Sequence, residues 1–179
     1  QYSGCEYDSE KGEFSLTSLG HTFKVTFPEG KVTFQQSGVP PLFSWQLIML
    51  NYLGRADGTP LTRIPISYRE LENGQVFFPA FQRESIQPLA SRFAANQKDQ
   101  LTYAFQTLGA QMDSQADVSG LFWFLPRFPV QVKIWLPDEE MGGSANILYD
   151  AAANCYLHTE DIAVAGNLIT NFLIKTAIV

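Results

Sequence analysis

The sequence has few of the residues from which metal centres are built. It contains two cysteines, Cys5 and Cys155, and two histidines, His21 and His158. A structural zinc site of the usual spacing needs four such ligands, and an iron–sulfur cluster held by one chain needs four cysteines. We therefore predict no metal centre of either kind.

Concentrated positive charge and long apolar runs are also missing. The 12 lysines and arginines are interspersed with 18 acidic residues, for a formal net charge of −6. A protein that binds nucleic acid or an anionic membrane needs a basic surface, so we expect neither as a partner. The longest apolar helix candidate, 162–179, is interrupted by Asn167, Asn171 and Lys175, and no window has the ~18 consecutive apolar residues of a membrane span.

The common short catalytic motifs are absent as well. The sequence has no G-x-S-x-G elbow, no G-x-x-x-x-G-K-[ST] phosphate loop, no G-x-G-x-x-G and no H-E-x-x-H. This disfavours the usual hydrolases, kinases and dinucleotide-dependent enzymes. We expect no bound cofactor, and the sequence favours a role other than catalysis while leaving an enzyme of another type open.

The two cysteines give information about the cellular compartment of the protein. Cys5 and Cys155 are 150 positions apart in a chain large enough to be stable without a disulfide. Reduced thiols are the favoured interpretation, with a disulfide as the alternative. We therefore expect a cytoplasmic protein.

The length and apolar content predict one domain spanning residues 1–179. A chain of 179 residues that is 45% apolar can bury one sizeable core. Apolar alternation predicts three antiparallel strands in the first forty residues, carried by EFSLTSLG, HTFKVTF and KVTFQ. A largely buried helix is expected over 42–55, followed by a strand in IPISYREL and a turn at Asn73-Gly74.

The second half of the chain adds helices and a further group of strands. Ser85 and Asn96 are each expected to cap a helix, and Gly109 to end the second one. The segments LFWFLP, FPVQVKIWLP and NILYD read as strands, and a last helix is predicted to start at Thr159. Strands in antiparallel groups separated by helices indicate an α+β fold. This fold would have an N-terminal β-meander, a central helical segment, and a C-terminal helix packed on the second strand group.

Strand alternation assigns two faces to FPVQVKIWLP. Val130, Val132 and Ile134 are expected to face the core. Gln131, Lys133 and Trp135 are expected on the other face, where Trp135 would cover a binding pocket or an interface.

Several stretches carry a family resemblance. They are SGCEYD, RADGTPLTRIPISYREL, FFPAFQRESIQPLASRF, LPRFPVQVKIWLPDEE and SANILYDAAANCYLHTEDIAVAG. Together they cover nearly the whole chain, which resembles the domain of unknown function 3786 family, found mainly in anaerobic bacteria and archaea. The resemblance implies a short N-terminal segment before Gln1 and a setting in anaerobic redox, corrinoid or one-carbon metabolism. It implies no catalytic residue, and the cysteine-rich cluster segment of some relatives is not in this sequence.

One candidate site is the acidic run that follows a predicted strand. Asp138, Glu139 and Glu140 are followed by Met141-Gly142-Gly143. A solvated turn is one interpretation. The alternative is a ligand-binding loop, in which close carboxylates bind a hard cation or raise one another's pKa.

A second loop is expected to face this acidic run. It contains Asp150, Tyr156 and His158, and we expect these side chains to bind a ligand together with the acids. His158, Asp150 and Glu139 are the candidates for acid–base catalysis, although a lone histidine is commonly a satisfied polar group. Cys155 precedes His158 by three residues, which suggests either a nucleophile pair or a buried inert thiol.

A third constellation consists of Arg55, Arg69 and Arg83 with nearby acids. Arg55 is expected to pair with Glu70 or Asp57 in a structural ion-pair network. Alternatively, Arg69 and Arg83 fork onto a carboxylate or phosphate ligand.

These observations leave three hypotheses for function. The first is a binding module for a small molecule or a partner protein. The second is an enzyme that uses the 138–161 segment, and the third is a structural subunit that packs on a partner through Trp135. The sequence does not decide the oligomeric state.

Overall fold

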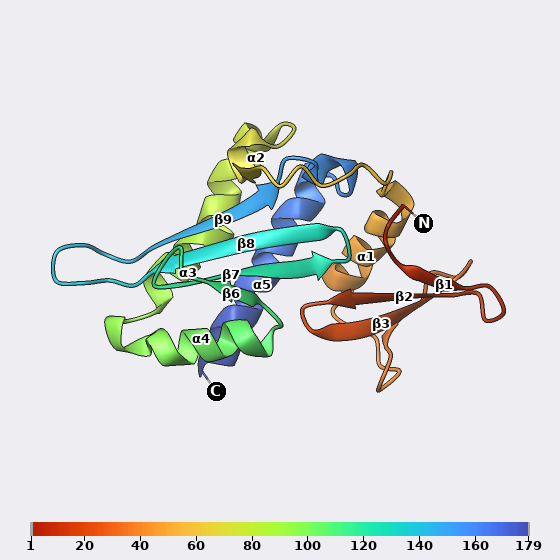
Figure 1. The fold of residues 1–179 in the computed structure, drawn as a ribbon, viewed down its shortest axis with the longest axis horizontal. Coiled ribbons are helices and arrows are strands. Elements are labelled where there is room, and N and C mark those ends of the chain that lie inside the picture. Colours follow the sequence, from red (N-terminus) through yellow and green to blue (C-terminus); the bar gives the residue numbers. More distant parts are fainter. Residues whose placement is uncertain (1, 179) are drawn as a thin grey trace.

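Two antiparallel sheets, one of four strands and one of five, organise the chain (Figure 1). A computed structural model describes residues 2–178. The predicted α+β class, with its strand meander, central helices and C-terminal helix, is confirmed.

The four-stranded sheet is the predicted N-terminal meander. Its strands are β1 Glu6–Asp8, β2 Glu13–Ser18, β3 His21–Thr26 and β4 Val32–Phe34, paired in sequence order. Phe23 and Val25 of β3 are buried against Leu16 and Val32, as the alternation predicts. Strand β1 was not predicted, because its side chains are mostly exposed and carry no apolar alternation.

The five-stranded sheet has the order β5-β9-β8-β7-β6. Its strands are β5 Pro65–Ser67, β6 Gln111–Asp113, β7 Val118–Leu125, β8 Phe128–Trp135 and β9 Ser144–Asp150. The predicted alternation of β8 is confirmed, because Val130, Val132 and Ile134 are buried while Gln131 and Lys133 are only half-buried. One face of this sheet is therefore core, and the other is left partly open.

The helices lie between and after the strands. They are α1 Phe43–Arg55, α2 Gly74–Phe81, α3 Gln87–Arg92, α4 Lys98–Thr107 and α5 Thr159–Ile178, with a π-helical segment Gln82–Ile86 between α2 and α3. The predicted helix over 42–55 and the predicted helix start at Thr159 are confirmed. Gly109 follows α4 with a φ of 77°, as expected of a glycine after a helix end.

The predicted caps at Ser85 and Asn96 are wrong. The helix already begins at Gly74, just after Asn73 with its left-handed φ of 57°, and continues through the π-helical segment that contains Ser85. Asn96 lies in a short 3₁₀ turn, where Gln97 accepts a hydrogen bond from the Ala94 amide at 2.8 Å. Pro88 does lie in the first turn of α3, but the chain is already helical before it, so no cap is needed at Ser85.

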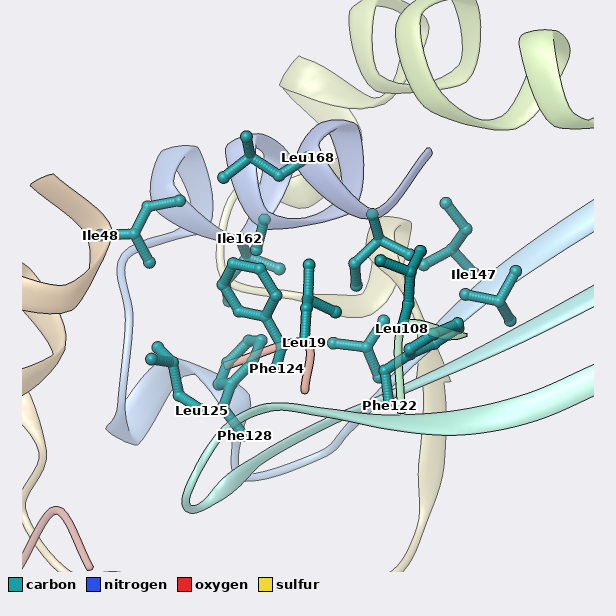
Figure 2. Close-up of a cluster of buried hydrophobic side chains, with 14 of the residues drawn as sticks. Leu19, Ile48, Leu108, Phe122, Phe124, Leu125, Phe128, Ile147, Ile162 and Leu168 are labelled. Carbon is teal, nitrogen blue, oxygen red and sulfur yellow. The ribbon is translucent and has the colours of Figure 1, made fainter. Parts of the chain in front are cut away.

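Side chains of the five-stranded sheet, the helices and the meander together form the hydrophobic core. Figure 2 shows Phe124 and Phe128 of the sheet lying beneath Ile162 of α5, with Phe122 farther along the sheet. All four are at most 1% exposed. The indole of Trp45 in α1 donates a hydrogen bond to Ser18 of the meander at 2.9 Å, so a buried polar contact joins this helix to the meander.

Helix α5 is the central core helix. It is long and apolar enough, by length and composition alone, to cross a membrane. Within the described residues, however, Ile162, Ile169 and Leu173 are fully buried in the protein core. Its apolar composition is therefore explained by packing against α1, α4 and the sheet.

Candidate functional site

A cavity of about 700 Å³ lies over the open face of the five-stranded sheet. Its floor is formed by side chains that alternate away from the core, namely Leu121 and Trp123 of β7, Gln131 and Lys133 of β8, and Leu148 of β9. One wall is the segment 60–65, which connects α1 to β5. The cavity is large enough for an organic molecule of moderate size.

Asp150, at the end of β9, holds this wall in place. Its carboxylate accepts hydrogen bonds from the Thr62 amide at 3.0 Å, the Thr62 hydroxyl at 2.9 Å, the Arg63 amide at 2.6 Å and the Ala152 amide at 2.9 Å. Burial acts to raise the pKa of Asp150, but the hydrogen bonds outweigh it and hold the pKa below its ordinary value. Arg63 adopts a left-handed φ of 59° at this point. The carboxylate is thus committed to structure rather than to a ligand.

Tyr156 fixes the other end of the same wall. Its hydroxyl donates to the Thr59 carbonyl, and its ring stacks on Tyr52 with centroids 6.0 Å apart. Asp57 accepts a hydrogen bond from the Thr59 amide at 2.8 Å. This bond closes a turn directly before the 60–65 segment. Tyr156 therefore lines the cavity mainly as a structural support.

The tip of the β7–β8 hairpin brings Arg127 to the cavity. The Arg127 amide donates to the Tyr52 hydroxyl at 2.9 Å, and that hydroxyl donates to the Ser3 carbonyl. Burial raises the pKa of Tyr52 well above its ordinary value, so its hydroxyl stays protonated and able to donate. Among the described residues, the guanidinium of Arg127 makes one long hydrogen bond, at 3.5 Å, to the Gly58 carbonyl.

Positive charge gathers at the cavity although the chain is acidic overall. Arg63, Arg127 and Lys133 line it, and Asp150 is the one acidic lining residue. Among residues 2–178, the ion pairs are Lys11–Asp8, Lys24–Glu13 and Arg83–Glu84, so none involves these three basic side chains. Their charges are available to a bound anion.

An apolar surface lies beside these charges. Trp123 is 38% exposed and pairs with Pro129 across the β7–β8 ladder. Leu121 and Leu148 extend the surface. At its edge, Asp113 accepts a hydrogen bond from Gln131 at 2.7 Å. Burial acts to raise the pKa of Asp113, but hydrogen bonds from Ser119, Gln115 and Gln131, together with the charge of Lys133, lower it.

The acidic run does not face this cavity. Asp138, Glu139 and Glu140 follow the end of β8, whereas Asp150 ends β9, and the seven residues of β9 separate the two by about 20 Å. The predicted facing of the two loops is therefore wrong. Asp138 accepts hydrogen bonds from the Glu140 amide at 2.9 Å and the Met141 amide at 2.7 Å. The exposed run forms a self-contained turn, which agrees with the solvated-turn interpretation.

His158 lies outside the cavity, and its polar neighbour is an arginine. Its Nε2 is 3.1 Å from Nη1 of Arg55, whose Nε donates to the Asn154 carbonyl at 3.0 Å. Within the described residues no carboxylate forms a hydrogen bond with the exposed His158 ring. Cys5 and Cys155 are free thiols, and no group of three or more potential metal ligands occurs between residues 2 and 178.

The predicted arginine network does not form. Arg55 pairs with neither acid proposed for it, because Glu70 accepts hydrogen bonds from the Ser67 amide and hydroxyl. The guanidinium of Arg69 lies 3.9 Å above the Phe78 ring. Arg83 pairs with the adjacent Glu84 at 2.7 Å. The three arginines therefore serve separate local contacts.

Sequence reasoning missed Trp123, Arg63 and Arg127 as lining residues. Trp135, which it favoured, is equally exposed at 38% but does not line the cavity. The alternation rule that placed Lys133 on the open face also places Trp123 there, so this part of the site was within reach of the sequence. The loop residue Arg63 gives no comparable signal.

Comparisons with known proteins identify a family without an assigned activity. The family described as domain of unknown function (DUF3786) matches residues 1–172. No curated protein and no solved structure matches the chain.

Proposed function

The chain belongs to the domain of unknown function DUF3786 family, and we propose that it is a binding module for a small organic anion with a planar apolar part. The ligand would lie in the cavity between the 60–65 wall and the open sheet face. The observation that carries this proposal is the set of three basic side chains, Arg63, Arg127 and Lys133, without ion-pair partners in the described residues.

The basic residues favour a carboxylate, phosphate or sulfonate group. Arginine presents paired N–H donors that match the two oxygens of such a group, and lysine adds a point charge. The one lining carboxylate, Asp150, is turned to the 60–65 segment by four hydrogen bonds, so it offers little to a cation.

The apolar residues favour a flat hydrocarbon body attached to that group. Trp123 and Leu148 provide a surface on the sheet, and Pro60 and Leu61 lie in the opposite wall. Ligand cavities are typically apolar with a few polar groups that fix orientation, and this lining has that composition.

The proposal is tested by isothermal titration calorimetry with a charge-matched pair of probes, 2-naphthoate and the neutral 2-naphthamide. We expect 2-naphthoate to bind at least about tenfold more tightly, and Lys133→Gln and Arg127→Gln each to remove most of that difference. Lys175→Gln, an exposed lysine on α5, is the control and should bind like the wild type. Equal affinity for the two probes would overturn the proposal.

The two free thiols, Cys5 and Cys155, support a reducing compartment, and we propose a cytoplasmic location on that ground. A role in anaerobic redox, corrinoid or one-carbon metabolism stays a prediction of the family resemblance. The enzyme hypothesis has less support, because the hydrogen-bond partner of His158 among the described residues is Arg55 rather than Asp150 or Glu139.

A further inference from the structure

One polar side chain lies in the apolar part of the cavity floor. Gln131 of β8 lines the cavity, is half-buried, and pairs with Leu121 of β7 on one side and Leu148 of β9 on the other. Paired residues of neighbouring strands point to the same face of a sheet, so the Gln131 amide lies between two leucine side chains. A flat ligand that packs on these leucines also covers the amide.

Asp113 of β6 fixes which end of this amide is left to the cavity. Nε2 of Gln131 donates a hydrogen bond to Oδ2 of Asp113 at 2.7 Å, and Asp113 itself does not line the cavity. A carboxylate can only accept hydrogen bonds, so the reverse orientation would place the carbonyl oxygen of Gln131 against a carboxylate oxygen, and the two would repel each other. The amino group therefore faces the sheet edge, and the carbonyl oxygen is the end that a ligand meets.

The carboxylate of Asp113 is itself held in place. Its Oδ1 accepts hydrogen bonds from the hydroxyl of the buried Ser119 and from the Gln115 amide at 3.0 Å. Burial acts to raise the pKa of Asp113, but these hydrogen bonds, the one from Gln131 and the charge of Lys133 hold the pKa below its ordinary value. Asp113 thus stays ionised at neutral pH and presents Oδ2 to Gln131 as an acceptor.

The carbonyl oxygen of Gln131 needs a hydrogen-bond donor from whatever covers it. Among residues 2–178, the hydrogen bond of the Gln131 side chain is the one that its amino group donates to Asp113, so solvent must supply a donor to the carbonyl. A purely apolar ligand body would displace that solvent and leave the acceptor unsatisfied, whereas an N–H or O–H group would replace it. A site with such a fixed polar group rejects analogues that lack the matching group more strongly than an apolar pocket discriminates by size.

We propose that Gln131 selects ligands whose flat apolar body carries a hydrogen-bond donor, such as the ring N–H of an indole, in addition to the anionic group. This selection rests on the proposed function, because it takes place in the same cavity. Gln131 accepts the hydrogen bond from the ligand and determines specificity. Asp113 is the positioning residue that orients Gln131.

The test compares acids that differ in the donor alone, in calorimetric titrations of the whole chain. Indole-5-carboxylate is paired with benzofuran-5-carboxylate, and indole-6-carboxylate with benzofuran-6-carboxylate. Each indole has a ring N–H where the benzofuran has an ether oxygen, while size and charge are matched. We expect at least one indole to bind about tenfold more tightly than its benzofuran.

Two outcomes separate this inference from the proposed function. If no indole binds more tightly than its benzofuran while 2-naphthoate still binds more tightly than 2-naphthamide, the selection by Gln131 is overturned and the proposed function stands. If 2-naphthoate and 2-naphthamide bind equally, both are overturned.

Gln131→Leu tests the residue itself. The variant should lose the indole preference and keep the preference for 2-naphthoate over 2-naphthamide, because the basic residues of the cavity remain. Gln111→Leu is the matched control, since Gln111 belongs to strand β6 of the same sheet but does not line the cavity, and it should bind all probes like the wild type. A Gln131→Leu variant with the full indole preference would contradict the assignment.

Asp113→Asn separates positioning from a merely structural role. The side-chain carbonyl of the asparagine can still accept from Ser119 and Gln115, which places its amino group opposite Gln131. The Gln131 amide should then turn over, so that its own amino group faces the cavity. We expect the indole preference to be lost while 2-naphthoate still binds more tightly than 2-naphthamide. A folded Asp113→Asn variant with the wild-type indole preference would show that Asp113 does not orient Gln131.

Discussion

The backbone amide of Arg63 donates a hydrogen bond to the carboxylate of Asp150 at 2.6 Å, across 87 positions of sequence. The same carboxylate accepts from the amide and hydroxyl of Thr62. These bonds attach an irregular segment to the end of a sheet strand. The segment thereby forms a wall beside the open face of the sheet, and the wall and the sheet together enclose the cavity.

Asp150→Ala is therefore expected to destabilise the protein by about 3 kcal/mol. The substitution leaves the amides of Thr62, Arg63 and Ala152 without their acceptor, and hydrogen bonds to charged groups contribute about 1.5–3 kcal/mol each. The free energy of unfolding in urea measures the effect. Asp138→Ala serves as the control, since Asp138 also accepts two backbone amides but in an exposed turn, and should destabilise the protein much less. Similar losses in the two variants would contradict the structural role of Asp150.

The stabilisation by Asp150 is also expected to depend on pH. Its pKa is lower in the folded state than in the unfolded chain, so its contribution is present above the unfolded value of about 3.9 and is lost as pH falls through the folded pKa. Unfolding titrations of the wild type and Asp150→Asn from pH 7 to pH 3 should give a difference in stability that is constant near neutrality and shrinks below about pH 4. A difference that grows toward low pH would contradict a folded-state pKa of Asp150 below its unfolded value.

Trp123 and Trp135 form a matched pair for testing the cavity, because both are 38% exposed on the same sheet. Only Trp123 lines the cavity. Trp123→Phe should weaken binding of 2-naphthoate about three- to tenfold through loss of aromatic contact, and Trp135→Phe should not. Titration calorimetry compares the two variants, and a larger effect at Trp135 would place the ligand elsewhere.

Gly74→Ala should destabilise the protein although alanine is the better helix former. A Cβ atom at Gly74 would lie 2.0 Å from the Tyr68 carbonyl oxygen, so the backbone would have to move. We expect a loss of about 2 kcal/mol in the free energy of unfolding, against the gain of up to about 1 kcal/mol that propensity alone predicts. Gly142→Ala has no atom within 4 Å of the added carbon and should be close to neutral. A stabilised Gly74→Ala variant would show that the turn before α2 is looser than described.

The meander and the five-stranded sheet are expected to unfold together. Trp45 of α1 donates to Ser18 and packs on Phe172 of α5, with ring centroids 5.0 Å apart, so separating the sheets would expose this contact. Thermal unfolding followed by far-ultraviolet circular dichroism and by tryptophan fluorescence should give one melting temperature. Two distinct transitions would indicate that the chain is not a single cooperative domain.

Much of the fold could be predicted because the responsible residues lie close together in sequence. Alternation in HTFKVTF and FPVQVKIWLP fixes the faces of β3 and β8, and the acidic first turn of α5 marks its start. The start of α2 at Gly74 could not be predicted in this way. It depends on Asn73 in a left-handed conformation and on close packing against Tyr68, and neither leaves a periodic signal.

The site was harder to predict because contacts between distant segments build it. Lys133 was placed correctly by alternation, but the role of Asp150 depends on a segment nearly ninety positions earlier in the chain. Asp138 and the three arginines, which belong to the clusters considered from sequence, instead make local contacts. Residues that lie close together in the sequence therefore did not prove to line a common cavity.

Binding of an organic anion over the open face of the five-stranded sheet is tested by titrating isotopically labelled protein with 2-naphthoate and following the titration by nuclear magnetic resonance. We predict saturable shifts of the Arg63, Trp123 and Gln131 amides, with little change at Glu139 and Glu140. Shifts confined to the 138–140 turn, or no shift at the cavity, would contradict the account.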